Sequence, residues 1–223
     1  MRDPAHATYQ SAAAGVDGLW RALDALPVIG IVRGCPPTRL LAVADAAFGA
    51  GLTVLELTLD STDALAGIAA VRQEFPERVV GAGTARTAEE ATAAIDSGAE
   101  FVVSPVTDVA LIEACDVAHI PALPGAATPS EIHSALELGA FAVKVFPACQ
   151  LGGPSFVAAI SGPLGNPRLV PTGGVDAGNA AAFLDAGAYA VAVGSGVFSR
   201  RAMEEGDLTI IASRVKETIG AVA

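Results

Sequence analysis

The sequence contains few of the residues that form covalent or metal cross-links. Its 223 residues include three cysteines, Cys35, Cys115 and Cys149, and three histidines. Because the cysteines are odd in number and far apart, they predict neither a disulfide framework nor a zinc site. The histidines form no local cluster with Cys, Asp or Glu. The composition therefore excludes a small disulfide scaffold and gives no sign of a metal centre.

The sequence also lacks the apolar segments of an exported or membrane-embedded protein. Residues 1–15 are rich in alanine but have no continuous apolar core of the signal-peptide type. No run of about 18 or more apolar residues suggests a membrane span. We therefore expect a soluble, cytoplasmic protein with reduced thiols.

Basic residues are scarce as well. The 13 lysines and arginines are outnumbered by 24 aspartates and glutamates, which gives a net charge of −11. This charge argues against a protein that binds nucleic acid or a membrane surface. It does not exclude a small anionic ligand, because local groups can override the field of the whole protein.

Apolar residues and glycine are abundant, at 52% of the chain and 24 residues respectively. This content and the absence of long charged blocks are typical of a folded chain with a sizeable core. No change in composition marks a second domain. We expect residues 1–15 to form a flexible N-terminal extension and residues 16–223 to form a single domain.

Short apolar runs alternate with alanine-rich amphipathic segments along almost the whole chain. The alternation predicts strands at 28–32, 53–59, 79–82, 101–103, 120–123, 142–146, 169–171 and 190–193. It predicts helices at 38–49, 63–75, 87–97, 107–115, 129–138, 154–161, 177–186 and 202–219, with an additional helix at 17–26 before the first strand. Thr87-Ala88-Glu89-Glu90 and Thr128-Pro129-Ser130-Glu131 have the capping-box pattern of helix starts.

Strict alternation of strand and helix implies a parallel sheet with helices on its faces. Eight such units predict an α/β protein with a (β/α)8 TIM barrel and an additional N-terminal helix. An open doubly wound sheet is the alternative. It is disfavoured because Arg33-Gly34-Cys35-Pro36-Pro37, and no Gly-x-Gly-x-x-Gly, follows the first strand.

One of only two lysines, Lys144, lies inside the apolar run 141–146. Burial of an ammonium group is costly, so an amine at such a position favours its neutral form. A neutral lysine amine is the nucleophile of Schiff-base chemistry. The alternative is a lysine whose stem packs in the core while its head reaches water.

A glutamate interrupts another predicted strand. By the alternation of side chains along a strand, Glu56 shares a face with Thr58, and Lys144 shares a face with Phe146. Both charged residues are therefore predicted to lie in the barrel interior, near the carboxyl ends of their strands, where barrel active sites are built. A buried ion pair without chemistry is the alternative, but two such residues in one interior favour a functional pair.

Two strand ends carry glycine-rich turns. Residues 171–175 read Pro-Thr-Gly-Gly-Val, and residues 193–197 read Val-Gly-Ser-Gly-Val. The loops after strands seven and eight of a barrel are its habitual phosphate site, where backbone N–H groups and helix dipoles attract an anion. We therefore predict that they bind phosphate; tight turns without a ligand are the alternative.

Taken in order, these segments resemble a known family. The segments on which the resemblance rests are Ile31-Val32-Arg33-Gly34, Val54-Leu55-Glu56-Leu57-Thr58-Leu59, Gly81-Ala82-Gly83-Thr84, Ser104-Pro105, Pro124-Gly125, Val143-Lys144-Val145-Phe146-Pro147-Ala148, Pro171-Thr172-Gly173-Gly174-Val175 and Val193-Gly194-Ser195. The chain resembles the class I aldolases that cleave 2-keto-3-deoxy-6-phosphogluconate and 4-hydroxy-2-oxoglutarate. The most specific segments are the one around Lys144 and the one around Glu56.

The resemblance implies a role for each matching position. It makes Lys144 the Schiff-base lysine and Glu56 the general acid and base. It places Arg33, Thr84, Pro105, Phe146 and Thr172 around the keto-acid substrate and Gly173, Gly174, Gly194 and Ser195 around its phosphate. It also implies a homotrimer that needs no metal and no cofactor.

One position departs from the family pattern. Many gluconate-type members carry arginine two residues after the threonine of the Glu56 segment, where it helps to hold the substrate carboxylate. Here that position is Asp60, which would repel a carboxylate. The related 6-phosphogalactonate aldolases also lack this arginine. The resemblance therefore leaves the preferred sugar acid open, and Arg33 is expected to carry more of the anion recognition.

The predicted activity is cleavage of a 2-keto-3-deoxy-6-phospho sugar acid or 4-hydroxy-2-oxoglutarate to pyruvate and an aldehyde. The alternatives are a non-catalytic phosphosugar-binding barrel, a 2-keto acid lyase or decarboxylase with another substrate, and a phosphosugar isomerase or epimerase. The last needs paired acid and base groups without a Schiff base, so the interior lysine argues against it.

Overall fold

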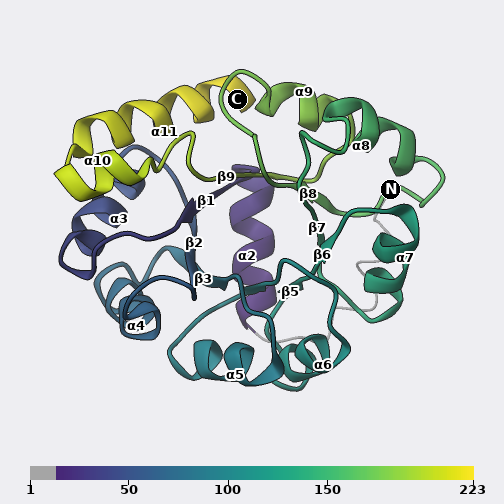
Figure 1. Ribbon diagram of the computed structural model, residues 1–223, viewed down its shortest axis with the longest axis horizontal. Helices are drawn as coiled ribbons and strands as arrows, with labels where there is room; N and C mark the ends of the chain where they lie inside the picture. Colours follow the sequence, from purple (N-terminus) through teal and green to yellow (C-terminus); the bar gives the residue numbers. More distant parts are fainter. Residues whose placement is uncertain (1–13) are drawn as a thin grey trace.

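The computed structural model describes residues 14–223 of the chain. Residues 1–13 of the expected N-terminal extension lie outside the described residues. The fold is α/β: parallel strands curl around an apolar interior, and helices pack on their outer face (Figure 1). No helix between residues 14 and 223 combines the length and the apolar character that crossing a bilayer requires.

The strands form two parallel sheets. The first has six strands in the order β5-β4-β3-β2-β1-β9, and the second has three in the order β6-β7-β8. Their bounds are β1 Val28–Val32, β2 Val54–Thr58, β3 Val79–Gly83, β4 Val102–Val103, β5 Ala122–Leu123, β6 Gly125–Ala126, β7 Val143–Val145, β8 Leu169–Pro171 and β9 Val191–Val193. All eight predicted runs contain a strand, most of them shorter than expected.

The additional strand, β6, arises at Pro124. The sequence predicts that the fifth strand ends at this residue, whereas the structure resumes pairing directly after it. Proline has no N–H to donate to a sheet. It separates β5, which pairs with β4, from β6, which pairs with β7.

Hydrogen bonds also cross the two gaps between the sheets. The Phe141 N–H donates to the Ala122 carbonyl over 2.9 Å, next to the break between β5 and β6. At the other edge, an isolated parallel bridge joins Thr172, which follows β8, to Ala192 in β9.

The helices follow the predicted alternation. Their bounds are α2 Ala14–Ala25, α3 Leu40–Gly49, α4 Ala64–Glu74, α5 Ala88–Asp96, α6 Val109–Val117, α7 Pro129–Glu137, α8 Pro154–Ser161, α9 Ala180–Asp185, α10 Arg200–Glu205 and α11 Leu208–Val222, with a 3-10 turn, η1, at Pro37–Arg39. The single helix predicted at 202–219 is wrong. Gly206 ends α10 in the left-handed conformation, and the Asp207 side chain caps α11 by accepting from the Ile210 N–H.

The two predicted capping boxes have different outcomes. Thr128 and Glu131 form the complete box at the start of α7. At α5, Thr87 accepts from the Glu90 N–H, but the Glu90 carboxylate accepts from the Arg86 N–H and so lies outside the box.

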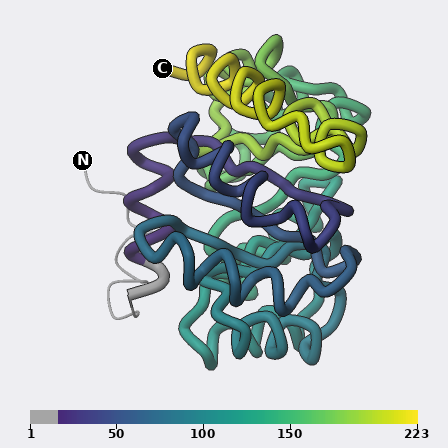
Figure 2. Tube along the Cα trace, turned by 90° about the vertical axis from the view of Figure 1, so that its left-hand side faces the viewer, coloured from purple at the N-terminus to yellow at the C-terminus, as the bar shows by residue number. Residues whose placement is uncertain are grey.

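The predicted alternation of faces is confirmed. Val54 and Ala142 belong to an inner apolar cluster, whereas Leu55 and Val143 pack toward the helices. Helix α2 adds Leu19 and Leu23 to the inner cluster beside Val54 and Val79, the first residues of β2 and β3. Figure 2 shows this helix, in purple, at one edge of the molecule. It therefore covers the amino ends of the strands and leaves their carboxyl ends to the loops.

Candidate active site

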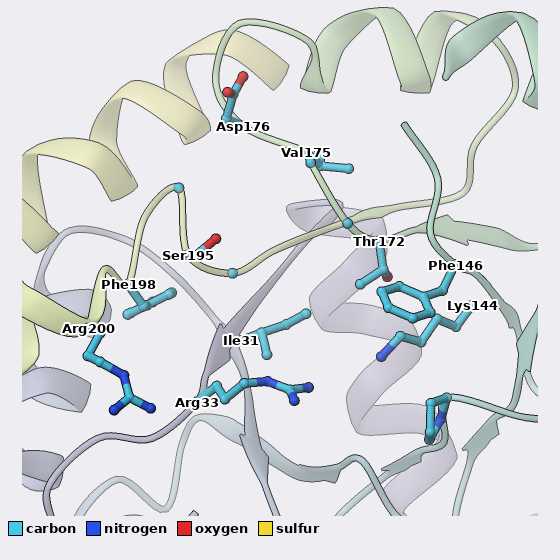
Figure 3. A pocket seen from close by; sticks show the side chains of 15 residues that line it. Ile31, Arg33, Lys144, Phe146, Thr172, Val175, Asp176, Ser195, Phe198 and Arg200 are labelled. Carbon is cyan, nitrogen blue, oxygen red and sulfur yellow. The ribbon is translucent and has the colours of Figure 1, made fainter. Parts of the chain in front are cut away.

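A cavity of about 570 Å³ opens at the carboxyl ends of the strands (Figure 3). Its lining comes from β1, β7, the loops after β1, β4, β7, β8 and β9, and the first residue of α10. The lining residues are Ile31, Arg33, Pro105, Lys144, Phe146, Thr172, Gly173, Gly174, Val175, Asp176, Gly194, Ser195, Gly196, Phe198 and Arg200.

Lys144 lies in the middle of β7 and is one of the few charged residues of the interior. It is 4% exposed, and its neighbours Val143 and Val145 face the helices. Its Nζ lies 5.4 Å from the centroid of the Phe146 ring, which also lines the cavity. Figure 3 shows the amine directed toward the open space between Phe146 and Arg33. The position gives an amine access to a bound molecule while most of its stem stays dry.

A glycine beside Lys144 lets another wall of the cavity approach. Gly125 is the register partner of Lys144 in β6. A Cβ at Gly125 would overlap the carbonyl of Pro105. Without a side chain there, the loop after β4 packs against the sheet and Pro105 reaches the same cavity as the amine.

Glu56 lies in β2 between Ile31 and Gly81 of the neighbouring strands. It is 1% exposed, and its Oε1 is buried without a hydrogen-bond partner among the described residues. A buried polar atom without a partner costs free energy, so native proteins retain it mainly where it has a task. The carboxyl group therefore has a free acceptor in a largely apolar interior.

The space for this carboxyl group comes from Gly83 at the end of β3. A Cβ at Gly83 would overlap Oε1, Cδ and Cγ of Glu56. The backbone φ of Gly83 is not in the left-handed region, so conformational freedom does not explain this glycine. Its lack of a side chain is what admits the glutamate.

Two opposing effects act on the pKa of Glu56. Burial raises it, because the charged form is poorly solvated inside the protein. The positive charges of Lys144 and Arg33 act in the opposite direction but do not cancel the burial, so the pKa stays above its ordinary value. No ion pair joins Glu56 to Lys144 within residues 14–223. The two groups are thus electrostatically coupled without a direct contact.

Arg33, directly after β1, is held by two side chains from neighbouring loops. Its Nη1 donates to Asp60 Oδ2 over 2.7 Å, and its Nη2 donates to Thr84 Oγ1 over 2.9 Å. Thr84 has a φ of 62°, a left-handed conformation that is uncommon for a β-branched residue. The unusual backbone at Thr84 places its hydroxyl against the guanidinium.

The predicted phosphate loops form the wall of the cavity beside β8 and β9. Gly173 and Gly174 have φ angles of 96° and 77°, which a residue with a side chain rarely adopts. The Asn179 side chain fixes this turn by donating to the Gly174 carbonyl over 2.9 Å. Within the described chain, the N–H groups of Gly174 and Ser195 donate to no backbone carbonyl. Both remain available to an anion.

Most of the predicted site residues gather around this one cavity. Those that line it are Arg33, Pro105, Lys144, Phe146, Thr172, Gly173, Gly174, Gly194 and Ser195. Glu56 and Thr84 do not line it. Glu56 is buried, and Thr84 accepts a hydrogen bond from Arg33, which does line the cavity.

Sequence reasoning missed Arg200 and Asp176, which also line the cavity. Neither interrupts an apolar run, so no pattern singles them out. The one available signal is their distance along the chain, since each follows a glycine-rich turn by a few residues. In the part of the chain that the structure describes, no three His, Cys, Asp or Glu side chains are placed to hold a metal ion.

Comparison with known proteins places this cavity in a family context. The family model described as "Aldolase: KDPG and KHG aldolase" matches residues 17–214. The chain belongs to this family. As a member of an aldolase family it is a carbon–carbon lyase, which confirms the resemblance drawn from the sequence.

Individual relatives are similar over most of their length. The 2-dehydro-3-deoxy-phosphogluconate aldolase of Pseudomonas aeruginosa is 38% identical over 87% of this chain and 87% of its own. The KDPG aldolase of Legionella pneumophila, solved with pyruvate captured as a covalent carbinolamine intermediate, has a TM-score of 0.81 and 29% identity over 89% of this chain and 96% of its own. A structure described as native KDPGal has the same TM-score and identity over 88% of this chain and 94% of its own.

Proposed function

We propose that this aldolase cleaves a 2-keto-3-deoxy-6-phospho sugar acid or 4-hydroxy-2-oxoglutarate to pyruvate and an aldehyde. The observation that carries the proposal is the placement of Lys144, a buried amine whose head opens into the cavity. The Legionella relative holds pyruvate in a covalent carbinolamine. An amine so placed can form the same kind of bond.

In the first step, the Lys144 amine attacks the C2 ketone of the substrate. The carbinolamine loses water and becomes a protonated imine, which is an electron sink. Pro105, Phe146 and Thr172 line the same cavity as the amine and would orient the keto acid.

In the second step, Glu56 removes the proton of the C4 hydroxyl, directly or through a water molecule. The C3–C4 bond breaks, its electron pair enters the imine, and an aldehyde leaves. The remaining enamine takes a proton at C3, and hydrolysis of the imine releases pyruvate and restores the amine. Burial raises the pKa of Glu56, which suits a carboxyl group that must both accept and return a proton.

The substrate's phosphate would bind at Gly173, Gly174, Gly194 and Ser195. The free N–H groups of Gly174 and Ser195 support this placement, because backbone amides hold an anion without adding a net charge. Arg33, held by its hydrogen bond to Thr84, would face the polar middle of the substrate. The acidic net charge of the chain does not oppose such local recognition.

We infer that the two sheets belong to one closed (β/α)8 barrel in a single domain spanning residues 16–223. The hydrogen bond between Phe141 and Ala122 and the bridge between Thr172 and Ala192 support closure at both gaps. The cytoplasmic location expected from the sequence stays a prediction.

We also propose a homotrimer. Three of the large apolar side chains exposed in the described residues, Val106, Val109 and Val117, lie on or beside α6 and support an interface between copies. Light scattering on the purified protein tests this proposal. A mass of three chains is expected, and a monomer would contradict it.

Borohydride trapping tests the central claim. Reduction of the enzyme in the presence of pyruvate should leave a covalent adduct on Lys144, detected by peptide mass spectrometry. The second lysine, the exposed Lys216, is the built-in control and should stay unmodified. Lys144→Ala should abolish adduct and cleavage, whereas Lys216→Ala should change neither. Unmodified Lys144 in the native enzyme would refute the mechanism.

A further inference from the structure

A second arginine faces the cavity from the side opposite Lys144. Arg200 is the first residue of α10 and follows the loop that carries Gly194 and Ser195. Figure 3 shows its guanidinium turned toward Arg33 rather than toward the outside of the helix. Its Nη2 lies 3.3 Å from the point that a Cβ at Gly34 would occupy, so it packs directly over the loop after β1.

The two arginines of the cavity differ in their partners. Both terminal nitrogens of Arg33 are occupied, one by the carboxylate of Asp60 and the other by Thr84. Among the described residues, the one carboxylate within ion-pair distance of Arg200 is Glu204, at 3.8 Å and one helical turn away, and the Arg200 side chain is 75% exposed. A pair of this length and exposure holds a side chain weakly. Arg200 therefore has the guanidinium that is free to bind a ligand.

The surroundings of Arg200 favour an anion at the end of the substrate. Within the described residues, Ser195, in the loop before α10, leaves its N–H unpaired to a backbone carbonyl, and so does Gly174 in the loop after β8. One acidic residue, Asp176, lines the same wall, but its Oδ1 already accepts from the Gly178 N–H over 2.8 Å. Figure 3 shows Asp176 at the far side of the loops from Arg200.

We propose that Arg200 is a specificity-determining residue that selects substrates ending in a phosphate monoester over those that lack one. The inference rests on the proposed aldolase function and deepens it. The guanidinium supplies a bidentate, charge-assisted contact to the phosphate dianion. The glycine-rich loops supply backbone N–H groups that donate to the same phosphate. Arg33, neutralised by Asp60, positions the middle of the substrate instead of competing for its phosphate.

The chain offers a matched control, because Arg201 is the next residue of the same helix. Its side chain is 84% exposed, pairs with Glu205 and does not line the cavity. Steady-state kinetics should compare Arg200→Ala with Arg201→Ala on a phosphorylated and an unphosphorylated 2-keto-3-deoxy sugar acid. For Arg200→Ala, kcat/KM on the phosphorylated substrate should fall about 10- to 100-fold, mainly through KM, since charged hydrogen bonds contribute that much. Arg200→Lys should lose less kcat/KM on the phosphorylated substrate, because lysine keeps the positive charge but cannot form a bidentate contact.

On the unphosphorylated substrate, Arg200→Ala should match the native enzyme within about twofold, and Arg201→Ala should match it on both substrates. Equal losses on both substrates, or equal behaviour of the two variants, would overturn the proposal. Calorimetric binding of inorganic phosphate provides a readout that needs no turnover, and only Arg200→Ala should weaken it. If pyruvate fails to label Lys144 in the native enzyme, the aldolase mechanism fails, while the phosphate titration still decides the role of Arg200.

Discussion

Arg33 and Asp60 form an ion pair in which Nη1 and Oδ2 are 2.7 Å apart, joining the loop after β1 to the loop after β2. Asp60 occupies the position at which the sequence predicts repulsion of a substrate carboxylate. In the structure the negative charge of Asp60 is paired with the guanidinium of Arg33. The ion pair therefore offsets the positive charge of Arg33, so this charge attracts a substrate anion less strongly. The hydrogen bond to Thr84 also fixes the position of the guanidinium.

Removing the charge of Asp60 should affect kinetics more than stability. Both side chains are more than a third exposed, so the pair contributes at most about 1 kcal/mol to folding. In Asp60→Asn the guanidinium gains a free donor, and we expect a lower KM for the anionic substrate at low ionic strength, with the effect reduced by salt. Asp63→Asn is the control, since Asp63 lies in the same loop without a bond to Arg33. An unchanged KM in Asp60→Asn would contradict the assignment.

The raised pKa of Glu56 predicts a pH-dependent stability. Because burial raises the folded-state pKa above the ordinary value, the folded state binds more protons than the unfolded state between those two values. The contribution of Glu56 to the free energy of unfolding should therefore be full below the ordinary value and decline as pH rises through the folded-state value. Glu56→Gln lacks this decline. Chemical denaturation of both proteins across pH measures it, and parallel curves would refute the direction of the shift.

Gly83→Ala should disable the site from the neighbouring strand. The added methyl group would overlap the Glu56 carboxylate, so the side chain must move or the strand must shift. Overpacking of this kind costs about 1–3 kcal/mol, and we expect kcat to fall by about 10²-fold or more because the acid and base group is displaced. Gly49→Ala and Gly220→Ala are controls, since a Cβ at either position has open space. A kcat equal to that of the native enzyme in Gly83→Ala would show that catalysis does not require the Glu56 carboxyl group at its position in the structure.

Leu19→Ala tests whether α2 is part of the fold. Leu19 is fully buried among the inner residues of the strands, and such truncations cost about 2–5 kcal/mol. The same change at Leu41, which is exposed on α3, should cost far less. Trp20, the only tryptophan, packs against Tyr189 and Phe141, so its fluorescence follows the docking of α2 during denaturation. Equal midpoints for the two variants would contradict a structural role for this helix.

Local periodicity was enough to predict the order of strands and helices and the inward direction of Glu56 and Lys144. Alternation within a strand depends only on backbone geometry, which is why it survives in the structure. The break at Pro124 and the division of the last helix at Gly206 were harder to predict. Proline and glycine are both known to interrupt regular structure. Whether a strand or a helix resumes after them depends on the neighbouring elements.

The contacts of loop side chains could not be predicted from the sequence. Asp60 and Arg33 are 27 residues apart, and their pairing depends on the relative height of two loops. Arg200 lines the cavity because α10 begins at this residue, beside the loop after β9. No sequence motif predicts the direction in which the first side chain of this helix points. Nor does the sequence show that Glu56 and Lys144, which both point inward, form no ion pair within residues 14–223.

The fit of Glu56 against Gly83 has a consequence for protein engineering. Two positions on adjacent strands behave as one unit, because a side chain at either consumes the volume that the other needs. Libraries that vary position 83 alone should return glycine almost exclusively. A shorter acid such as aspartate at position 56 would release space, so redesign of this acid and base group has to proceed by paired substitutions.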